Sequence, residues 1–183
     1  MSMKALLAAL SMASFACICL AGQPARSDWR GFGAANVAGQ PVELFYLSNE
    51  VQRTPDGYTR VWTKALSRPA LEQAVGKLDS AVSERVTARL NRGYIPPLSQ
   101  MRTLTNDQIA WLAASEEVAN DSKLQPTTLV LYEVDCPKQM MRQLRSEVTV
   151  KGRNHSSTSA SEWTPIPPES NLTVLHTLLC TSG

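Results

Sequence analysis

The stretch TTLVLYEVDC, residues 127–136, decides the fold. Leucine, tyrosine and β-branched residues dominate it, and this composition is typical of a strand in the middle of a sheet. Pro137 follows directly and ends the strand, because proline has no backbone N–H to donate to a neighbouring strand. A central strand needs partners, so the flanking sequence is expected to supply further strands.

A β-hairpin is predicted on the N-terminal side. Residues 42–48 and 58–66 are both rich in aromatic and β-branched residues. Between them lies the sequence TPDG, in which Pro55 pre-sets the turn and Gly57 supplies a positive φ. The two segments therefore read as antiparallel strands that join the strand over 127–136.

Residues 68–123 predict a two-helix insertion. Over Pro69–Leu90 the apolar residues recur at steps of three or four, which is the pattern of one amphipathic helix. They are Leu71, Val75, Leu78, Val82, Val86 and Leu90. We expect this stripe to pack on the sheet of the same domain. A second helix is predicted over 105–119, where Thr105 and Gln108 fit a capping box.

The C-terminal third returns to strand chemistry. Residues 144–151 predict a strand, residues 152–161 a solvated polar loop, and residues 163–168 an extended segment stiffened by proline. Residues 172–180 are apolar enough to close the core. Their composition fits a helix or a strand, and Asn171 with the leucine spacing suits the start of a helix.

The N-terminus carries the pattern of an export signal. Lys4 precedes an apolar stretch that runs to about Ala21, with small residues before a cut after Ala21. We expect a cleaved signal peptide over 1–21 and a leader over 22–41. A retained membrane anchor and lipid attachment at Cys17 or Cys19 are the alternatives, although neither cysteine follows a good lipobox.

Four cysteines are present, and two of them lie in the predicted signal. Cys136 and Cys180 remain, and an even pair in an oxidising compartment predicts a disulfide. A two-cysteine metal site and a catalytic thiol are the competing interpretations. A metal site needs more ligands, and neither His155 nor His176 shows metal-type spacing to the cysteines. We therefore expect a structural disulfide and no metal.

Composition and motifs argue against several function classes. The formal net charge is +2, and it falls to about +1 without Lys4, which does not indicate a nucleic-acid-binding protein. The sequence contains no Gly-x-Ser-x-Gly elbow, no glycine-rich phosphate loop and no His-Glu-x-x-His. We expect no catalytic residues and no cofactor, and no stable membrane span once the signal is cleaved.

One local basic excess stands out near the C-terminal end. Acidic residues interleave with it, so a solvated face and a patch for an acidic partner are both open interpretations. The basic residues are Lys138, Arg142, Arg145, Lys151 and Arg153, and the acidic ones are Glu133, Asp135 and Glu147.

An ordered set of short segments resembles one known family. They are Leu44-Phe45-Tyr46, Arg60–Lys64, Leu131–Cys136, Arg142–Arg145, Trp163–Ser170 and Leu179-Cys180. In this order they resemble the surface-adhesin protein E-like domain family of small exported bacterial proteins. The resemblance implies an antiparallel sheet with packed helices and a disulfide. It also implies adhesion to host matrix and serum proteins from a lipid anchor. The chain departs from the family in its weak lipobox, its insertion over 68–123 and its end three residues after Cys180.

These inferences predict a single α+β domain over 42–183, with one disulfide and the helical insertion over 68–123. The expected function is an exported, non-catalytic binding or adhesin-like envelope protein, located in the periplasm, on the cell surface or in the medium. Its partner would be a host or envelope protein. A periplasmic small-ligand carrier, with the insertion as a cover over the sheet, and a structural envelope protein are the alternatives.

Overall fold

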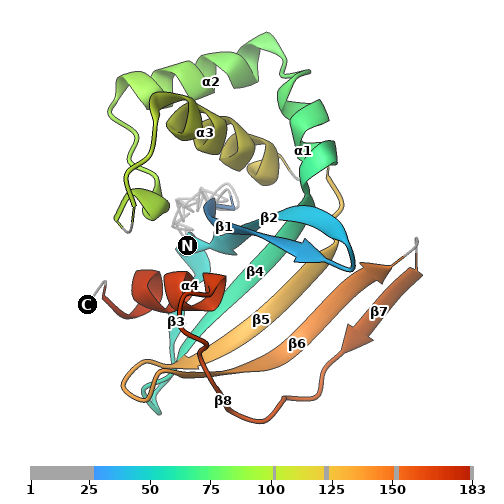
Figure 1. The fold of residues 1–183 in the computed structure, drawn as a ribbon, viewed down its shortest axis with the longest axis vertical. Coiled ribbons are helices and arrows are strands. Elements are labelled where there is room, and N and C mark those ends of the chain that lie inside the picture. The colour runs from blue at the N-terminus through green and yellow to red at the C-terminus, as the bar shows by residue number, and fades with distance from the viewer. Residues whose placement is uncertain (1–26, 101, 122–123, 151–152, 182–183) are drawn as a thin grey trace, which may run out of the picture.

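The computed structural model describes residues 27–100, 102–121, 124–150 and 153–181. Its body is one eight-stranded antiparallel sheet in which β1-β2-β4-β5-β6-β7 follow one another, while short β3 and β8 pair with β4 and β6 (Figure 1). The strands are β1 (Trp29–Val37), β2 (Gln40–Leu47), β3 (Gln52–Arg53), β4 (Thr59–Ser67), β5 (Thr128–Asp135), β6 (Met140–Val150), β7 (Arg153–Ser157) and β8 (Thr164–Pro165).

Four α-helices accompany the sheet, so the predicted α+β class with an antiparallel sheet is correct. They are α1 (Arg68–Val75), α2 (Ser80–Asn91), α3 (Asn106–Asn120) and α4 (Asn171–Cys180), with short 3₁₀ turns η1 (Ser48–Glu50) and η2 (Pro97–Gln100). No helix of the described segments is both long and apolar enough to cross a membrane.

The two strand predictions that anchor the fold are confirmed. β5 lies between β4 and β6 and pairs antiparallel with both. β2 and β4 form the predicted antiparallel pair, with Val42 opposite Ser67 and Tyr46 opposite Thr63. The turn at Gly57, whose φ is +84°, closes a hairpin between the short strand β3 and β4 and not between β2 and β4. In it the Thr54 amide donates to the Tyr58 carbonyl at 2.8 Å.

Helices cover both faces of the sheet. Side chains at neighbouring positions of a strand point to opposite faces, so the sheet contributes to two buried layers. One face packs against α4, and its buried residues are Phe32, Val61, Val134, Met141, Leu175, Leu178 and Leu179. The other face packs against α1 and α3, with Phe45, Leu66, Leu71, Val118 and Ala119 buried between them. Residues 171–180, for which the sequence left helix and strand open, form the helix α4. The Ser170 hydroxyl caps its start by accepting from the Thr173 amide at 3.2 Å.

The single helix predicted over 69–90 is wrong, because the chain breaks between α1 and α2. Gly76 ends α1, and the Asp79 side chain starts α2 by accepting from the Val82 amide at 2.8 Å. A capping carboxylate here restarts the helix in a new direction. Leu71 of α1 packs on the sheet as expected, whereas α2 packs on α3. The second predicted helix is confirmed as α3, with the Thr105–Gln108 capping box in place.

The predicted leader over 22–41 is also wrong for the residues that form β1. β1 pairs with β2 from Trp29 opposite Leu47 to Val37 opposite Gln40. Its glycine-rich composition hid the strand, yet that composition is what the packing needs. A Cβ atom at Gly33 would collide with the Asn171 side chain of α4, and one at Gly31 would lie 3.2 Å from Leu112 of α3. The predicted signal peptide, residues 1–21, lies outside the described residues.

The polar loop predicted over 152–161 is wrong for the residues that form β7. Arg153–Ser157 is a strand, β7, which pairs with β6 although all five of its residues are exposed. Backbone hydrogen bonds to β6 are enough to form it, because they do not depend on apolar side chains. The strand predicted over 144–151 is real but longer, since β6 begins at Met140.

Candidate functional site

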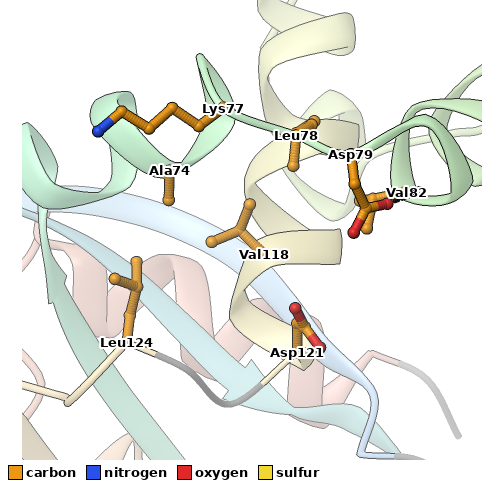
Figure 2. A pocket seen from close by; sticks show the side chains of 8 residues that line it. All are labelled: Ala74, Lys77, Leu78, Asp79, Val82, Val118, Asp121 and Leu124. Carbon is orange, nitrogen blue, oxygen red and sulfur yellow. Dashed lines mark hydrogen bonds between the residues drawn. The ribbon is translucent and has the colours of Figure 1, made fainter.

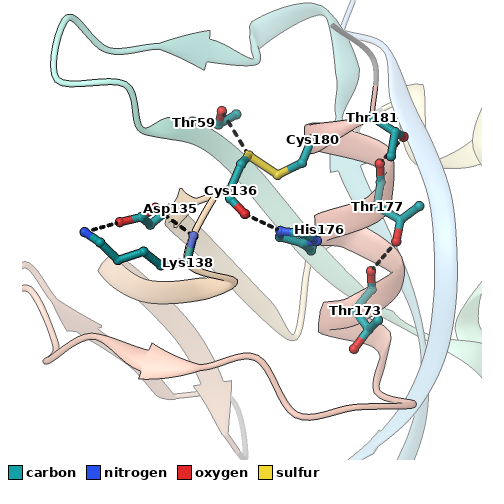
Figure 3. Close-up of a disulfide and its surroundings, with 9 residues drawn as sticks. All are labelled: Thr59, Asp135, Cys136, Lys138, Thr173, His176, Thr177, Cys180 and Thr181. Atoms are coloured by element: carbon teal, nitrogen blue, oxygen red, sulfur yellow. Dashed lines mark hydrogen bonds and ion pairs between the residues drawn. A yellow bond between two sulfur atoms is a disulfide. The ribbon is translucent and has the colours of Figure 1, made fainter.

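The two cysteines meet where the central strand and the last helix end. Cys136 follows β5, Cys180 closes α4, and the two are joined as a disulfide with their Cα atoms 5.6 Å apart (Figure 3). The bond links positions 44 residues apart in sequence. The predicted disulfide is therefore present, and it ties α4 to the middle of the sheet.

His176 lies beside this disulfide. Its Nε2 donates to the Cys136 carbonyl at 3.2 Å (Figure 3). It precedes Cys180 by four residues on α4, so the two side chains share one face of the helix. One ligand-type atom from each of Cys136, His176 and Cys180 lies within 4.8 Å of the others. No metal-type spacing between the histidines and the cysteines was found in the sequence, and the His-x-x-x-Cys spacing that places His176 beside the disulfide was not considered.

A buried carboxylate joins three elements on the opposite side of the sheet. The Glu116 side chain, on α3, is fully buried and accepts from the Gly31 amide at 2.9 Å. Its other oxygen lies 3.2 Å from Arg30 Nε and 2.5 Å from Arg89 Nη2. Both guanidinium groups also lie over the ring of Tyr94. The sequence showed no partner for Glu116, because its arginines come from β1 and α2.

The pKa values in this cluster reflect burial and charge in competition. Burial would lower the pKa of the Arg30 guanidinium, but the Glu116 carboxylate raises it above its ordinary value. Burial raises the pKa of the Glu116 carboxyl, while the charges of Arg30 and Arg89 act in the opposite sense. Burial also raises the pKa of Tyr94. Through its ion pairs, Glu116 links α3 to Arg30 of β1 and Arg89 of α2.

A second buried carboxylate lies in the centre of the sheet and pairs with a residue of the basic run. Glu133 on β5 accepts from Arg60 Nε and Arg142 Nε, each at 2.8 Å. Two further basic residues of the run are also paired, Lys138 with Asp135 at 3.0 Å and Arg145 with Glu147 at 2.7 Å. The charges of Lys138, Arg142 and Arg145 are thus cancelled locally, which favours a solvated face over a patch for an acidic partner at these three residues.

Lys64 is a buried cation on β4. Its Nζ donates to the Ala119 carbonyl at 2.7 Å and lies 4.2 Å from the centre of the Trp29 ring. Burial lowers its pKa to about 8. Because only 8% of the residue is exposed, its protonation state is coupled to folding.

We predict that Lys64 makes the protein more stable as the pH rises from about 8 to 10.5. In this range the folded protein has released the Lys64 proton, whereas the unfolded chain still holds it, so unfolding must take up a proton. The gain is at most about 1.4 kcal/mol per pH unit. Urea unfolding at several pH values up to about 9.5 should show a flatter pH dependence for Lys64→Met than for the wild type.

Lys77→Met is the matched control, because Lys77 is exposed. In this variant the free energy of unfolding should change with pH as it does in the wild type. Equal slopes for Lys64→Met and the wild type would contradict the coupling.

The described residues also line several hollows. One of about 190 Å³ lies between α1, α2 and the end of α3, with Leu78, Val82 and Val118 at its floor and Lys77 and Asp79 at its rim (Figure 2). It is smaller than the roughly 300 Å³ at which small-molecule sites begin. The Asp79 carboxylate is already used as the cap of α2.

A larger groove runs along β1. Two adjoining hollows of about 270 and 360 Å³ share Gly33, Ala34, Leu98 and Arg102 in their walls. Glu43 faces the first of them, 3.6 Å from Arg68. Burial raises the pKa of the Glu43 carboxyl, and Arg68 acts against that shift. The groove lies between the insertion and the sheet.

The two edges of the sheet differ in their surroundings. β1 is contacted by α3, α4 and η2. β7 pairs with β6 on one side, and all five of its residues are exposed. Among the described residues no strand pairs with its outer edge. An edge of this kind presents backbone N–H and C=O groups that another chain can pair with.

No protein-family model, curated protein or solved structure matches this chain. The resemblance to the surface-adhesin protein E-like domain family therefore stays a prediction.

Proposed function

We propose that this chain is an exported, non-catalytic binding protein that captures an extended segment of a protein partner along the outer edge of β7. The observation that carries the proposal is that β7 is the terminal strand of the sheet and is exposed over its full length. Binding by strand addition takes its affinity from main-chain hydrogen bonds. The disulfide is compatible with export, since such bonds persist in oxidising compartments.

The edge has few of the features with which sheets block unwanted pairing. Its sequence, RNHSS, contains no proline and no lysine, and its register with β6 is regular from Ser157 to Arg153. Arg153 is its one residue with a formal charge at pH 7. The partner segment should therefore be extended and polar, with an acidic residue opposite Arg153.

A partner protein suits this edge better than a second copy of the chain. A stable dimer buries about 1,200 Å² or more. A five-residue strand without one apolar side chain cannot supply such an area by itself. A weaker, reversible contact made by backbone groups is what β7 offers, and this is the behaviour of a capture surface.

The test uses peptides selected from a displayed random library on the oxidised protein. We expect the selected peptides to slow amide hydrogen exchange in β7 and β6. Methylation of alternate backbone nitrogens of a peptide should abolish its binding, because strand addition needs those N–H groups. Peptides that protect other elements, or that bind equally well when methylated, would overturn the proposal.

Two neighbouring proline variants provide the matched control. In an antiparallel edge strand, one of two adjacent residues directs its N–H to the sheet and the other directs it outward. Of Asn154→Pro and His155→Pro, one should lower stability, and the other should leave stability unchanged but block peptide binding. A concentration-dependent dimer in native mass spectra, abolished by the same variant, would instead assign the edge to a second copy.

A small-ligand carrier is the second candidate, and the groove along β1 favours it. Its two hollows adjoin at Arg102 and Leu98, between the insertion and the sheet. A small molecule that co-purifies with the protein and leaves on Arg102→Ala substitution would support this function. A native mass spectrum that shows only the mass of the protein itself would count against the carrier function.

A further inference from the structure

An imidazole lies next to the disulfide, and a covalent link alone does not need it. Cys136, His176 and Cys180 bring two sulfurs and one imidazole together, with their ligand-type atoms within 4.8 Å of one another. Within the described segments this is the one group of three or more such side chains close enough to hold a metal ion. In a tetrahedral zinc site the sulfur and nitrogen ligands lie about 2.0 to 2.3 Å from the ion. Such bonds hold neighbouring ligand atoms about 3.3 to 3.8 Å apart. The two bonded sulfurs would have to move apart to this separation on reduction, whereas the imidazole already lies within 4.8 Å of both.

We propose that, once the disulfide is reduced, Cys136, His176 and Cys180 bind one thiophilic divalent ion such as Zn²⁺. A dithiol reductant supplies two electrons and two protons, becomes a disulfide itself and leaves two free thiols on the protein. The ion then displaces both thiol protons, and the two thiolates and the neutral imidazole become its ligands.

Two of the three ligands are positioned by α4 independently of the disulfide. His176 and Cys180 are one turn apart on the same face of the helix. α4 is held on the sheet by Leu175, Leu178 and Leu179, which are all buried. Reduction therefore leaves the helix docked through its apolar face, with both ligands still directed toward the end of β5.

The third ligand comes from the sheet. Cys136 directly follows β5, which is paired on both sides, so its backbone is fixed. Neither cysteine is fully buried, and a water molecule can therefore take the fourth position around the ion. Such a site, with three protein ligands and one exchangeable position, is of the open kind.

The disulfide and the ion exclude each other, because each uses both sulfurs. When a protein disulfide oxidises the site, it takes up two electrons from the two thiolates and two protons from water and becomes a dithiol. The thiolates of Cys136 and Cys180 then form their disulfide again, and the ion leaves. The same three residues would thus give a stapled, metal-free form under oxidising conditions and a metal-bound form under reducing conditions. The inference is independent of the β7 edge.

The test uses Co²⁺ as a spectroscopic probe on purified protein that has been reduced with a dithiol and freed of it under anaerobic conditions. We expect one equivalent of Co²⁺ to bind with thiolate charge-transfer bands and intense visible bands of tetrahedral cobalt, and Zn²⁺ to displace it. Oxidised protein should show none of these bands. The Cys136→Ser/Cys180→Ser double variant should also lack them.

His176→Gln decides whether the imidazole takes part. We expect at least a tenfold loss of affinity in this variant. His155→Gln, which changes the exposed histidine of β7, should bind as the wild type does. Equal affinity for His176→Gln and the wild type would overturn the three-ligand site.

A thermal measurement keeps the proposal testable if the reduced protein is unstable. Zn²⁺ should raise the unfolding midpoint of the reduced wild type, because it binds the folded form. It should raise the midpoint less in His176→Gln and leave that of the double serine variant unchanged. A reduced wild type that gains no more from Zn²⁺ than the double serine variant would refute the site.

Discussion

Replacing Cys180 with serine should lower the free energy of unfolding by about 4 kcal/mol. The disulfide closes a loop between positions 44 residues apart, and in the chain-entropy account a link of this length removes about that much conformational freedom from the unfolded chain. The loss is a large part of the 5 to 15 kcal/mol that typically stabilises a domain. Urea unfolding of the variant and of the wild type would measure it.

The folded structure of the variant should change little. α4 keeps its apolar contacts through Leu175, Leu178 and Leu179, so the circular dichroism spectrum should remain that of the wild type. Reduced wild type and the double variant Cys136→Ser/Cys180→Ser should match Cys180→Ser in stability when metal is absent. A reduced wild type as stable as the oxidised protein would show that the link constrains nothing.

Replacing Glu116 with glutamine should cost about 3 kcal/mol. Removing one partner of a buried ion pair leaves the other charge without compensation. Here Arg30 and Arg89, whose side chains are only 23% and 17% exposed, would face a neutral amide. An arginine guanidinium does not lose its charge in proteins. The amide oxygen can still accept from the Gly31 N–H, so the loss reports on charge. Urea unfolding at pH 7 would measure it.

Glu133→Gln is the matched control for this substitution. Its carboxylate is as deeply buried as that of Glu116, but its partners Arg60 and Arg142 are 41% and 30% exposed. Water can solvate these guanidinium groups when the charge is removed, so we expect a loss of about 1 kcal/mol. If the Glu116→Gln variant is as stable as the wild type, burial keeps the Glu116 carboxyl protonated. This result would contradict the prediction.

Much of the sheet could be predicted because its signals are local. The composition of residues 127–136 predicted β5, two strand-like segments close together in sequence predicted the β2–β4 pairing, and the capping box predicted the start of α3. The disulfide followed from the count of cysteines. Each of these features depends on residues that lie close together in sequence or on a pairing with no competitor.

The remainder depended on contacts that the sequence does not display. β1 has a weak strand composition and exists because β2 pairs with it along its whole length. The apolar period of 69–90 continues across the break before Asp79, so periodicity alone could not show where α1 ends.

The candidate sites were hidden for the same reason. Glu116 lies 85 residues from Gly31 and 27 from Arg89, and a single sequence gives no measure of such distances. His176 differs, because its spacing to Cys180 on one helix face could have been noticed. Only the position of Cys136 next to that face required the structure.

The contact between β1 and α4 has a consequence for how the polypeptide folds. The Asn171 side chain of α4 donates to the Ala34 carbonyl of β1 at 2.8 Å, across 137 residues of sequence. The first strand and the last helix of the described fold are thus neighbours. This contact cannot form before α4 has been synthesised, and contacts this distant in sequence form slowly.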